Sequence, residues 1–331
     1  MTSPSRPIFS LSTLFTSLSI HKPYLPMITL YPAPDLSLPF RPGRVPRHAQ
    51  KSRDLDLSQI SSQQAKSEAR HILLGGLSPM AWRVLDLLAT GGVLSTNRLD
   101  SAERTLRKWA QMRLLDRLVV GDQDLRQQLL TFGLEDAQPM LYTLGPVGIE
   151  IATQRHDVPP PTGYQGYSLS RVLHDVITNE IVLRLGETIG ARGWTVEWLG
   201  KYEGAITDRS QKQVILEPDA LVRFRKGEDE RAFLIEYHNE DKQGRAALKV
   251  EKYEAAFNEG NWRQRWEVEK FPPVLVVFWQ PIVGAGYKNV VEGKRLNCTY
   301  YGKTLKAVLE GKLEEWVNIA TGQKEVTLPQ E

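Results

Sequence analysis

Apolar residues recur at helical spacing in a series of segments along this chain. Such a period places them on one face of a helix, where they pack against a core. The segment 77–90 shows the pattern well, because Ser78 suits the N-cap and Pro79 suits the first helical position. By the same criterion, helices are expected over 77–90, 94–99, 101–112, 146–153, 168–190, 243–258 and 304–309.

Short apolar runs between these helices predict β-strands. The runs 220–224 and 232–237 are separated by the polar turn 226–231, which indicates a β-hairpin. Residues 275–278 are apolar without alternation, as expected of a strand that is covered on both faces. The expected strands are 118–120, 140–144, 194–199, 220–225, 231–237, 274–279 and 297–301.

The order of these elements predicts two ordered units. Helix, short helix, helix and then paired strands is the order of a winged helix-turn-helix, which is expected over 55–155, with one extra helical turn in the polar stretch 121–138. A linker rich in Pro and Gly follows over 156–167. The segment 168–315 then has the order α-β-β-β-α-β and predicts a mixed β-sheet flanked by helices. The expected fold class is α/β, with 316–331 as a C-terminal tail.

Composition narrows the class of protein. With 331 residues and 41% hydrophobic content, the chain is long enough for two cores. The 42 basic and 39 acidic residues leave a net charge of +3, so any basic surface must be local. Cys298 is the single cysteine, which excludes an intramolecular disulfide and fits a cytoplasmic location. No apolar run approaches the roughly 18 residues of a membrane span, so no membrane partner is expected.

The N-terminal segment differs from the rest of the chain. Residues 1–53 are rich in Ser, Pro and Leu, and Asp35 is their one acid among several Lys and Arg residues. We expect residues 1–54 to form a disordered basic tail. Two alternatives remain: a translation start at Met27 or later, and a tail that touches phosphates.

The third expected helix has a basic face. Six cations lie on it or directly beside it: Arg98, Arg104, Arg107, Lys108, Arg113 and Arg117. The recognition helix of a helix-turn-helix enters the major groove, where Arg reaches guanine edges and other cations neutralise phosphates. Double-stranded DNA is therefore the expected partner. Nearby acids offset part of the charge, so a solvated helical face is the alternative, and winged helices also bind proteins.

Two carboxylates mark the predicted hairpin. Asp219 follows Pro218 and opens the first strand, and Glu236 lies near the end of the second. Antiparallel pairing can bring both side chains to one edge of the sheet, where two carboxylate oxygens suit a hard cation such as Mg²⁺. The alternative is a pair of surface carboxylates at strand ends.

The arrangement of PD, a hairpin, an acidic residue and then a helix resembles the PD-(D/E)xK nuclease core. The longer pattern LEPDALVRF followed by FLIEYHNEDK, with a winged-helix-like segment upstream, resembles the bacterial replication-relaxation family over roughly residues 75–310. The resemblance implies a PD-(D/E)xK-like domain with Mg²⁺ or Mn²⁺ as the cofactor of an active site. It also implies a role in plasmid or mobile-element replication and DNA relaxation, alongside replication or mobilisation proteins.

The resemblance further implies which residues would act. The nuclease pattern has Lys two residues after the second carboxylate, but this chain has His238, which could be a ligand, a base, or the mark of a site that no longer cuts. Lys249 and Tyr253 resemble the Q-x-x-x-Y motif of some nucleases, and Lys249 could replace the missing lysine. A solvent-facing lysine with Tyr253 packed on the sheet is the alternative. Glu180 resembles an additional metal ligand, whereas His174 is expected to pack or cap.

Other chemistries lack their motifs. The sequence has no P-loop, no G-x-S-x-G, no H-E-x-x-H and no His-hydrophobe-His triplet, and the glycines at 284–286 are expected to form a loop. Two functions remain. One is a metal-dependent endonuclease or nickase that uses Asp219 and Glu236; the other is a non-cutting DNA-binding accessory or regulator. The histidine at 238 favours the second, and a toxin-like or defence nuclease would share the same core.

Overall fold

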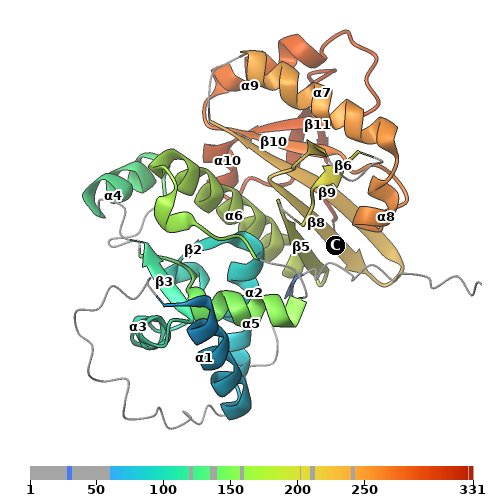
Figure 1. The fold of residues 1–331 in the computed structure, drawn as a ribbon. Helices are drawn as coiled ribbons and strands as arrows, with labels where there is room; N and C mark the ends of the chain where they lie inside the picture. Colours follow the sequence, from blue (N-terminus) through green and yellow to red (C-terminus); the bar gives the residue numbers. More distant parts are fainter. Residues whose placement is uncertain are drawn as a thin grey trace, which may run out of the picture.

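The computed structural model describes residues 28–31, 60–118, 122–134, 140–156, 160–201, 203–208, 213–239, 243–326 and 328–330, and Figure 1 shows the fold. The first elements in chain order are β1 (Ile28–Tyr31), α1 (Ser62–Gly75), α2 (Pro79–Gly91), β2 (Val93–Ser95), the 3₁₀ helix η2 (Thr96–Arg98), α3 (Glu103–Gln111), β3 (Leu115–Leu118), α4 (Asp122–Thr131), β4 (Leu141–Leu144), α5 (Pro146–His156) and η3 (Tyr164–Gly166). The remaining elements are α6 (Leu169–Gly190), β5 (Thr195–Gly200), β6 (Ile206–Thr207), β7 (Val214–Leu216), β8 (Ala220–Lys226), β9 (Asp229–His238), α7 (Gln243–Glu259), α8 (Trp262–Trp266), β10 (Val274–Phe278), α9 (Pro281–Val291), β11 (Tyr300–Thr304), α10 (Leu305–Leu309), β12 (Glu315–Asn318) and β13 (Lys324–Val326).

The largest sheet in the described ranges is mixed. Its eight strands run in the order β1-β5-β8-β9-β10-β11-β12-β13. The strands β5, β8 and β9 pair antiparallel, β9, β10 and β11 pair parallel, and β12 and β13 add antiparallel strands at the end. The expected α/β class, with a mixed sheet between helices, is confirmed. No helix in these ranges is both long and apolar enough to cross a bilayer.

Helices cover both faces of the large sheet, with α6 on one side and α7 and α9 on the other (Figure 1). Successive side chains of a strand point to opposite faces. Val222 and Ile235 accordingly pack in one core with Ile181 of α6. Leu221 and Leu234 pack in a second core with residues of α7 and α9. The alternation therefore decides which helix each strand residue meets.

A smaller antiparallel sheet organises the N-terminal unit. Its strands run in the order β2-β4-β3, and α1, α2, α3 and α5 belong to the same unit (Figure 1). Leu88 of α2, Leu106 of α3 and Ile151 of α5 are buried in a shared core. The hydroxyl of Ser78 caps α2 by accepting from the amide of Ala81 at 3.2 Å, and Pro79 follows at the first position, as the sequence predicts.

The N-terminal unit packs directly on α6. Asn179 donates from Nδ2 to the carbonyl of Gly91 at 2.8 Å and to that of Val93 at 2.7 Å. A Cβ on Gly91 would lie 2.5 Å from the Trp198 ring, so only glycine fits there. Tyr164 lies in the segment expected as a linker, yet it is 2% exposed and donates to Asp175 at 2.9 Å. The two units therefore share a buried interface that α6 carries.

Several segments differ from their predicted structure. The segment 316–331 is not a tail, because β12 and β13 extend the large sheet and Trp316 is fully buried. The backbone of β1 pairs antiparallel with β5, so strand pairing reaches into 1–54, although most of that segment lies outside the described residues. The glycines at 284–286 lie inside α9 rather than in a loop. The expected helix 94–99 is a strand followed by the short η2, and the extra turn within 121–138 is the full helix α4.

A buried carboxyl after β5 gives the stability of this fold a specific pH dependence. Glu203 is 9% exposed and accepts from the amide of Gly200 at 2.9 Å. Burial raises the pKa of Glu203 from 4.5 to about 7, against the opposing effects of that hydrogen bond and of Arg265. Because the folded-state pKa lies above the unfolded value, stability is lost as the pH rises from about 4.5 through 7.

We expect Glu203→Gln to raise the free energy of unfolding by about 2–3 kcal/mol at pH 8 and to leave it unchanged at pH 4. Glutamine keeps an acceptor for the Gly200 amide and removes the buried charge. Urea unfolding at both pH values measures the difference, with the exposed Glu228→Gln as a control that changes neither value. An equal effect of Glu203→Gln at both pH values would contradict the assignment.

Candidate functional site

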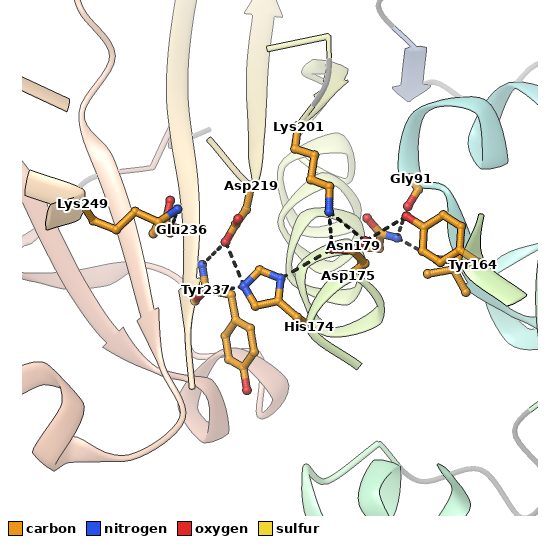
Figure 2. Close-up of polar contacts among 11 residues, drawn as sticks. Gly91, Tyr164, His174, Asp175, Asn179, Lys201, Asp219, Glu236, Tyr237 and Lys249 are labelled. Carbon is orange, nitrogen blue, oxygen red and sulfur yellow. Dashed lines mark hydrogen bonds and ion pairs between the residues drawn. The ribbon is translucent and has the colours of Figure 1, made fainter. Parts of the chain in front are cut away.

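The register of the β8–β9 hairpin places Asp219 and Glu236 opposite each other. Ala220 pairs with Ile235, so Asp219, one residue before β8, comes opposite Glu236. Residues directly opposite in an antiparallel pair lie on one face with Cβ atoms about 4.5–5.5 Å apart. Oδ2 of Asp219 accepts from the amide of Tyr237 at 2.8 Å and holds the carboxylate at the strand end (Figure 2). The structure thus brings the two predicted carboxylates together.

Helix α7 supplies two side chains to Glu236. The ammonium of Lys249 forms an ion pair with Oε1 of Glu236, and the hydroxyl of Tyr253 donates to Oε2 at 2.9 Å. Lys249 and Tyr253 are four residues apart and therefore adjacent on one helical face. Glu236 is 2% exposed, and the Lys249 side chain remains 29% exposed. A lysine consequently stands at the second carboxylate, although position 238 does not provide it.

Burial and charge act strongly on this ion pair. Burial raises the pKa of Glu236, the charge of Asp219 raises it further, and Lys249 and Tyr253 oppose both effects. Burial lowers the pKa of Lys249, but Glu236 and Asp219 outweigh burial and hold that pKa above its ordinary value. The raised pKa of Glu236 favours a neutral carboxyl, whereas the raised pKa of Lys249 favours a charged ion pair. Because Lys249 contacts Glu236 directly, we favour the charged pair at neutral pH.

His174 of α6 meets Asp219 from the other side of the sheet. Its Nε2 lies 3.4 Å from Oδ2 of Asp219 and 3.2 Å from the carbonyl of Tyr237, and its Nδ1 lies 3.5 Å from Oδ1 of Asp175 (Figure 2). Burial lowers the pKa of His174, but Asp219 and Asp175 outweigh it and raise the pKa to about 9. Lys201 binds both oxygens of Asp175 at 2.9 Å. A protonated imidazole therefore lies between two carboxylates.

Sequence reasoning treated His174 as a packing or capping residue and did not consider Asp175 or Lys201. The sequence offered one signal, an adjacent His and Asp inside an otherwise apolar helix. His174 and Asp175 belong to the site because His174 lies next to Asp219. Asp219 is 45 residues away in sequence, and only the packing of α6 on the sheet brings the two together.

His238 does not have the chemistry that its position suggests. Its side chain is 6% exposed, and its ring lies edge to face with Tyr287 at 5.3 Å between centroids. Burial and, to a smaller extent, the charge of Lys249 lower the pKa of His238 to about 4. A group with that pKa is neutral near pH 7 and is a poor base there. Its Nδ1 has no hydrogen-bond partner among the described residues.

The expectation that Glu180 is an additional metal ligand is wrong in this structure. Its carboxylate is bound by the guanidinium of Arg98 at 2.5 and 2.7 Å and by Nε of Arg184 at 2.6 Å. These two cations compensate the charge, so burial of Glu180 needs no metal. Glu180 also lies six residues beyond His174 on α6, about 9 Å along the helix axis.

Arg98, expected to contact DNA, is also committed elsewhere. Its guanidinium binds both Glu180 and Glu187 of α6, and its side chain is 20% exposed. Arg98 makes these contacts because it joins η2 to the long helix α6. Arg113 is similarly held by Glu68 of α1 at 2.7 Å and is 19% exposed. Neither side chain is available for a groove without breaking an ion pair.

The remaining cations of the predicted basic face are more accessible. Arg104 and Arg117 are exposed, Lys108 is half-buried, and Arg107 is 68% exposed while it pairs with Glu103 one turn away. Exposed pairs of this kind contribute little and rearrange readily. Arg104 and Arg107 are therefore the best-placed cations of α3 for phosphate or base contacts.

The carboxylate pair fits the metal ion that the resemblance implies. Two close carboxylates are hard oxygen donors, and a divalent cation relieves their mutual repulsion. Within the described ranges, no group of three or more His, Cys, Asp or Glu side chains could hold a metal ion.

No family model, curated protein or solved structure matches this chain.

Proposed function

We propose that this chain binds double-stranded DNA and nicks or cleaves its backbone with Mg²⁺ or Mn²⁺ held by Asp219 and Glu236. The observation that supports cleavage is the position of Lys249. The sequence favoured a non-cutting protein because position 238 lacks lysine, and α7 supplies a lysine to the same carboxylate. The α-β-β-β-α-β order around this site is that of the PD-(D/E)xK core, which supports the same assignment.

Each side chain of the site then has a role. When bound, the metal ion would polarise a phosphoryl oxygen and lower the pKa of an attacking water. Lys249 would stabilise the negative charge that develops on the phosphate. Tyr253 holds Glu236 in place through its hydrogen bond, and His174 holds Asp219 from the opposite side.

DNA binding is assigned to a winged helix-turn-helix formed by the N-terminal unit. Its order α2-β2-η2-α3-β3-α4-β4 and its antiparallel sheet β2-β4-β3 support this proposal, with α3 as the recognition helix. Arg104 and Arg107 project from α3 into solvent. Contact with a duplex would position these guanidinium groups at phosphates or guanine edges.

We expect the double variant Arg104→Ala with Arg107→Ala to bind duplex DNA at least about tenfold more weakly. The slope of log affinity against log salt should fall by about 2, because two phosphate contacts are lost. Fluorescence anisotropy with a labelled duplex over a salt series measures both quantities. The control is Lys270→Ala, which removes an exposed cation from the α/β unit. If the double variant and the control bind equally, α3 is not the DNA-binding helix.

A second candidate function is a non-cutting DNA-binding accessory or regulator. The environment of Glu236 favours this non-cutting function, because the carboxylate is almost fully buried and its two oxygens already bind Lys249 and Tyr253. Such a site can persist as a compensated ion pair that stabilises the fold without releasing Glu236 to a metal. The role of the sheet edge would then be to grip DNA or a protein partner.

Incubation with supercoiled plasmid distinguishes the two functions. Cleavage predicts that Mg²⁺ or Mn²⁺ supports conversion to open-circular or linear DNA, that EDTA stops it, and that Asp219→Asn abolishes it. Salt-sensitive binding of the same plasmid without conversion identifies the accessory function. By the family resemblance, we propose a role in plasmid or mobile-element replication and relaxation, together with replication or mobilisation proteins.

A further inference from the structure

We propose that a cavity beside the carboxylate pair binds an unpaired nucleotide of the DNA on which the site acts. This inference rests on the proposed function and specifies the form of its substrate. The cavity has a volume of about 1000 Å³ and lies among α9, β11, α10 and β12. Figure 1 labels α9, β11 and α10, and β12 follows β11 in the strand order of the large sheet.

Strand register connects the cavity to the site. Glu236 pairs with Val276 of β10, and Val276 pairs with Gly302 of β11, which lines the cavity. Neighbouring strands are about 4.8 Å apart, so Gly302 lies about 10 Å from Glu236 along one rung of the sheet. Residues on one rung of a parallel sheet point to the same face. The carboxylate pair and the cavity therefore lie on the same face of the large sheet, about two strands apart.

Two buried polar side chains near the cavity, those of His238 and Tyr287, do not line it themselves. Nδ1 of His238 and the hydroxyl of Tyr287 have no hydrogen-bond partner among the described residues. The Tyr287 ring contacts both His238 and Phe278, and Phe278 lines the cavity. Phe278 is thus the contact that joins these two side chains to the cavity lining.

The lining combines an apolar floor with a charged rim. Phe278, Val317 and Ile319 are apolar, and Gly284 and Gly302 lie so close to the Phe278 ring that a side chain on either would contact it at 2.9 Å or less. Four lysines line the rim together with Glu314 and Glu315: Lys288, Lys303, Lys312 and Lys324. The floor suits the flat face of a base, and the rim suits its phosphate.

The rim lysines can turn toward a phosphate at small cost. Lys288, Lys312 and Lys324 pair with Glu292, Glu310 and Glu315, but their side chains are 55%, 71% and 72% exposed, and exposed pairs contribute little. Lys303 lies over the Trp316 ring at 5.1 Å and donates to the carbonyl of Lys312. No ion pair with a carboxylate of the described residues involves Lys303, so its charge is available to an anion.

An unpaired nucleotide explains this combination better than a duplex does. A duplex presents phosphates and groove edges, and its base faces are hidden in the stack. Proteins that bind single strands instead combine a cationic groove with apolar or aromatic surfaces on which bases rest. A hollow with lysines above an apolar floor fits that description. We therefore assign the cavity to a base that is displaced from the duplex next to the reacting phosphate.

Filling the cavity tests the assignment. Ala285 is exposed on α9 and lines the cavity, so Ala285→Trp blocks it without replacing a buried side chain. We expect this variant to bind labelled oligothymidylate at least tenfold more weakly in EDTA, while a hairpin duplex binds within twofold of wild type. The matched control is Asn289→Trp, one turn further along α9 at an exposed position outside the cavity. Equal single-strand affinity of Ala285→Trp and Asn289→Trp would overturn the proposal.

A charge variant provides an independent readout. Lys288→Ala combined with Lys324→Ala should lower the salt slope of oligothymidylate binding by about 1.4, whereas the exposed Lys294→Ala outside the cavity should not. Unchanged slopes, or a wild-type protein that does not bind oligothymidylate, would refute the nucleotide assignment. Plasmid nicking reports on Asp219 and Glu236 separately. If the protein nicks plasmid but Ala285→Trp does not change oligothymidylate binding, only the cavity proposal is refuted. If Ala285→Trp weakens oligothymidylate binding but the protein does not nick plasmid, only cleavage is refuted.

Discussion

Replacing Lys249 with alanine is expected to lower the free energy of unfolding by about 3–5 kcal/mol at pH 8. Lys249 is the cation that contacts Glu236, whose side chain is 2% exposed and lies opposite Asp219. Removing it leaves a buried carboxylate beside a second negative charge, and only the Tyr253 hydroxyl still binds Glu236. Because the interior solvates an isolated charge poorly, most of the lost ion-pair energy remains uncompensated.

The loss should depend on pH in a defined direction. The pKa of Glu236 is raised above 4.5 even with Lys249 present, and removing the cation raises it further. A carboxyl with a raised folded-state pKa loses stability as the pH rises above its unfolded value. Lys249→Ala should therefore be less destabilising at pH 5, where Glu236 can take up a proton, than at pH 8.

Urea unfolding of wild type, Lys249→Ala and Lys252→Ala at pH 5 and pH 8 measures this effect. Lys252 is an exposed lysine of the same helix and leaves the buried pair intact, so its variant should stay within about 0.5 kcal/mol of wild type at both pH values. A Lys249→Ala protein as stable as Lys252→Ala at pH 8 would mean that the ion pair does not form.

Asp219→Asn is expected to remove cleavage while preserving the fold. Asparagine retains an oxygen that accepts from the Tyr237 amide, so the strand end keeps its hydrogen bond. The change also removes the negative charge closest to Glu236, which offsets the loss of the His174 contact. We expect the free energy of unfolding to stay within about 1 kcal/mol of wild type.

The effect of Asp219→Asn on activity should be large. A metal ion contributes several kcal/mol of charge stabilisation to phosphodiester hydrolysis, so losing one of two protein ligands is expected to slow plasmid nicking on the order of a thousandfold. The control is Asp229→Asn, an exposed carboxylate at the far end of the same hairpin, where it pairs with Lys226. Asp229→Asn should nick at the wild-type rate. If both variants nick equally, Asp219 does not take part in cleavage.

Local patterns predicted the parts of this molecule that depend on local structure. The hairpin was predicted from two apolar runs and a polar turn, and its register alone sets Asp219 opposite Glu236. The helical period correctly predicted α2, α6 and α7 to within about two residues at each end. The i, i+4 spacing likewise put Lys249 and Tyr253 on one face, although it did not reveal that this face meets Glu236.

Long-range contacts explain most of what the sequence did not predict. Arg98 and Arg104 carry the same charge a few residues apart, yet Arg98 binds Glu180 across 82 residues of sequence and Arg104 faces solvent. No charge pattern separates these two cases before the packing of α6 is known. His174 acquires its role for the same reason. β12 was missed because its segment alternates polar residues with Trp316, and its pairing with β11 and β13 makes it a strand.

We propose above that Asp219 and Glu236 share one divalent cation. Calorimetric titration of Mn²⁺ into the full-length protein, Asp219→Asn and Asp229→Asn tests it directly. We predict that wild type and Asp229→Asn bind one ion with equal affinity. Asp219→Asn should bind it at least about a hundredfold more weakly, because even the groups that merely orient a ligand affect affinity by about 10–100-fold. Equal Mn²⁺ affinity in all three proteins, or no binding by wild type, would contradict the shared-ion site.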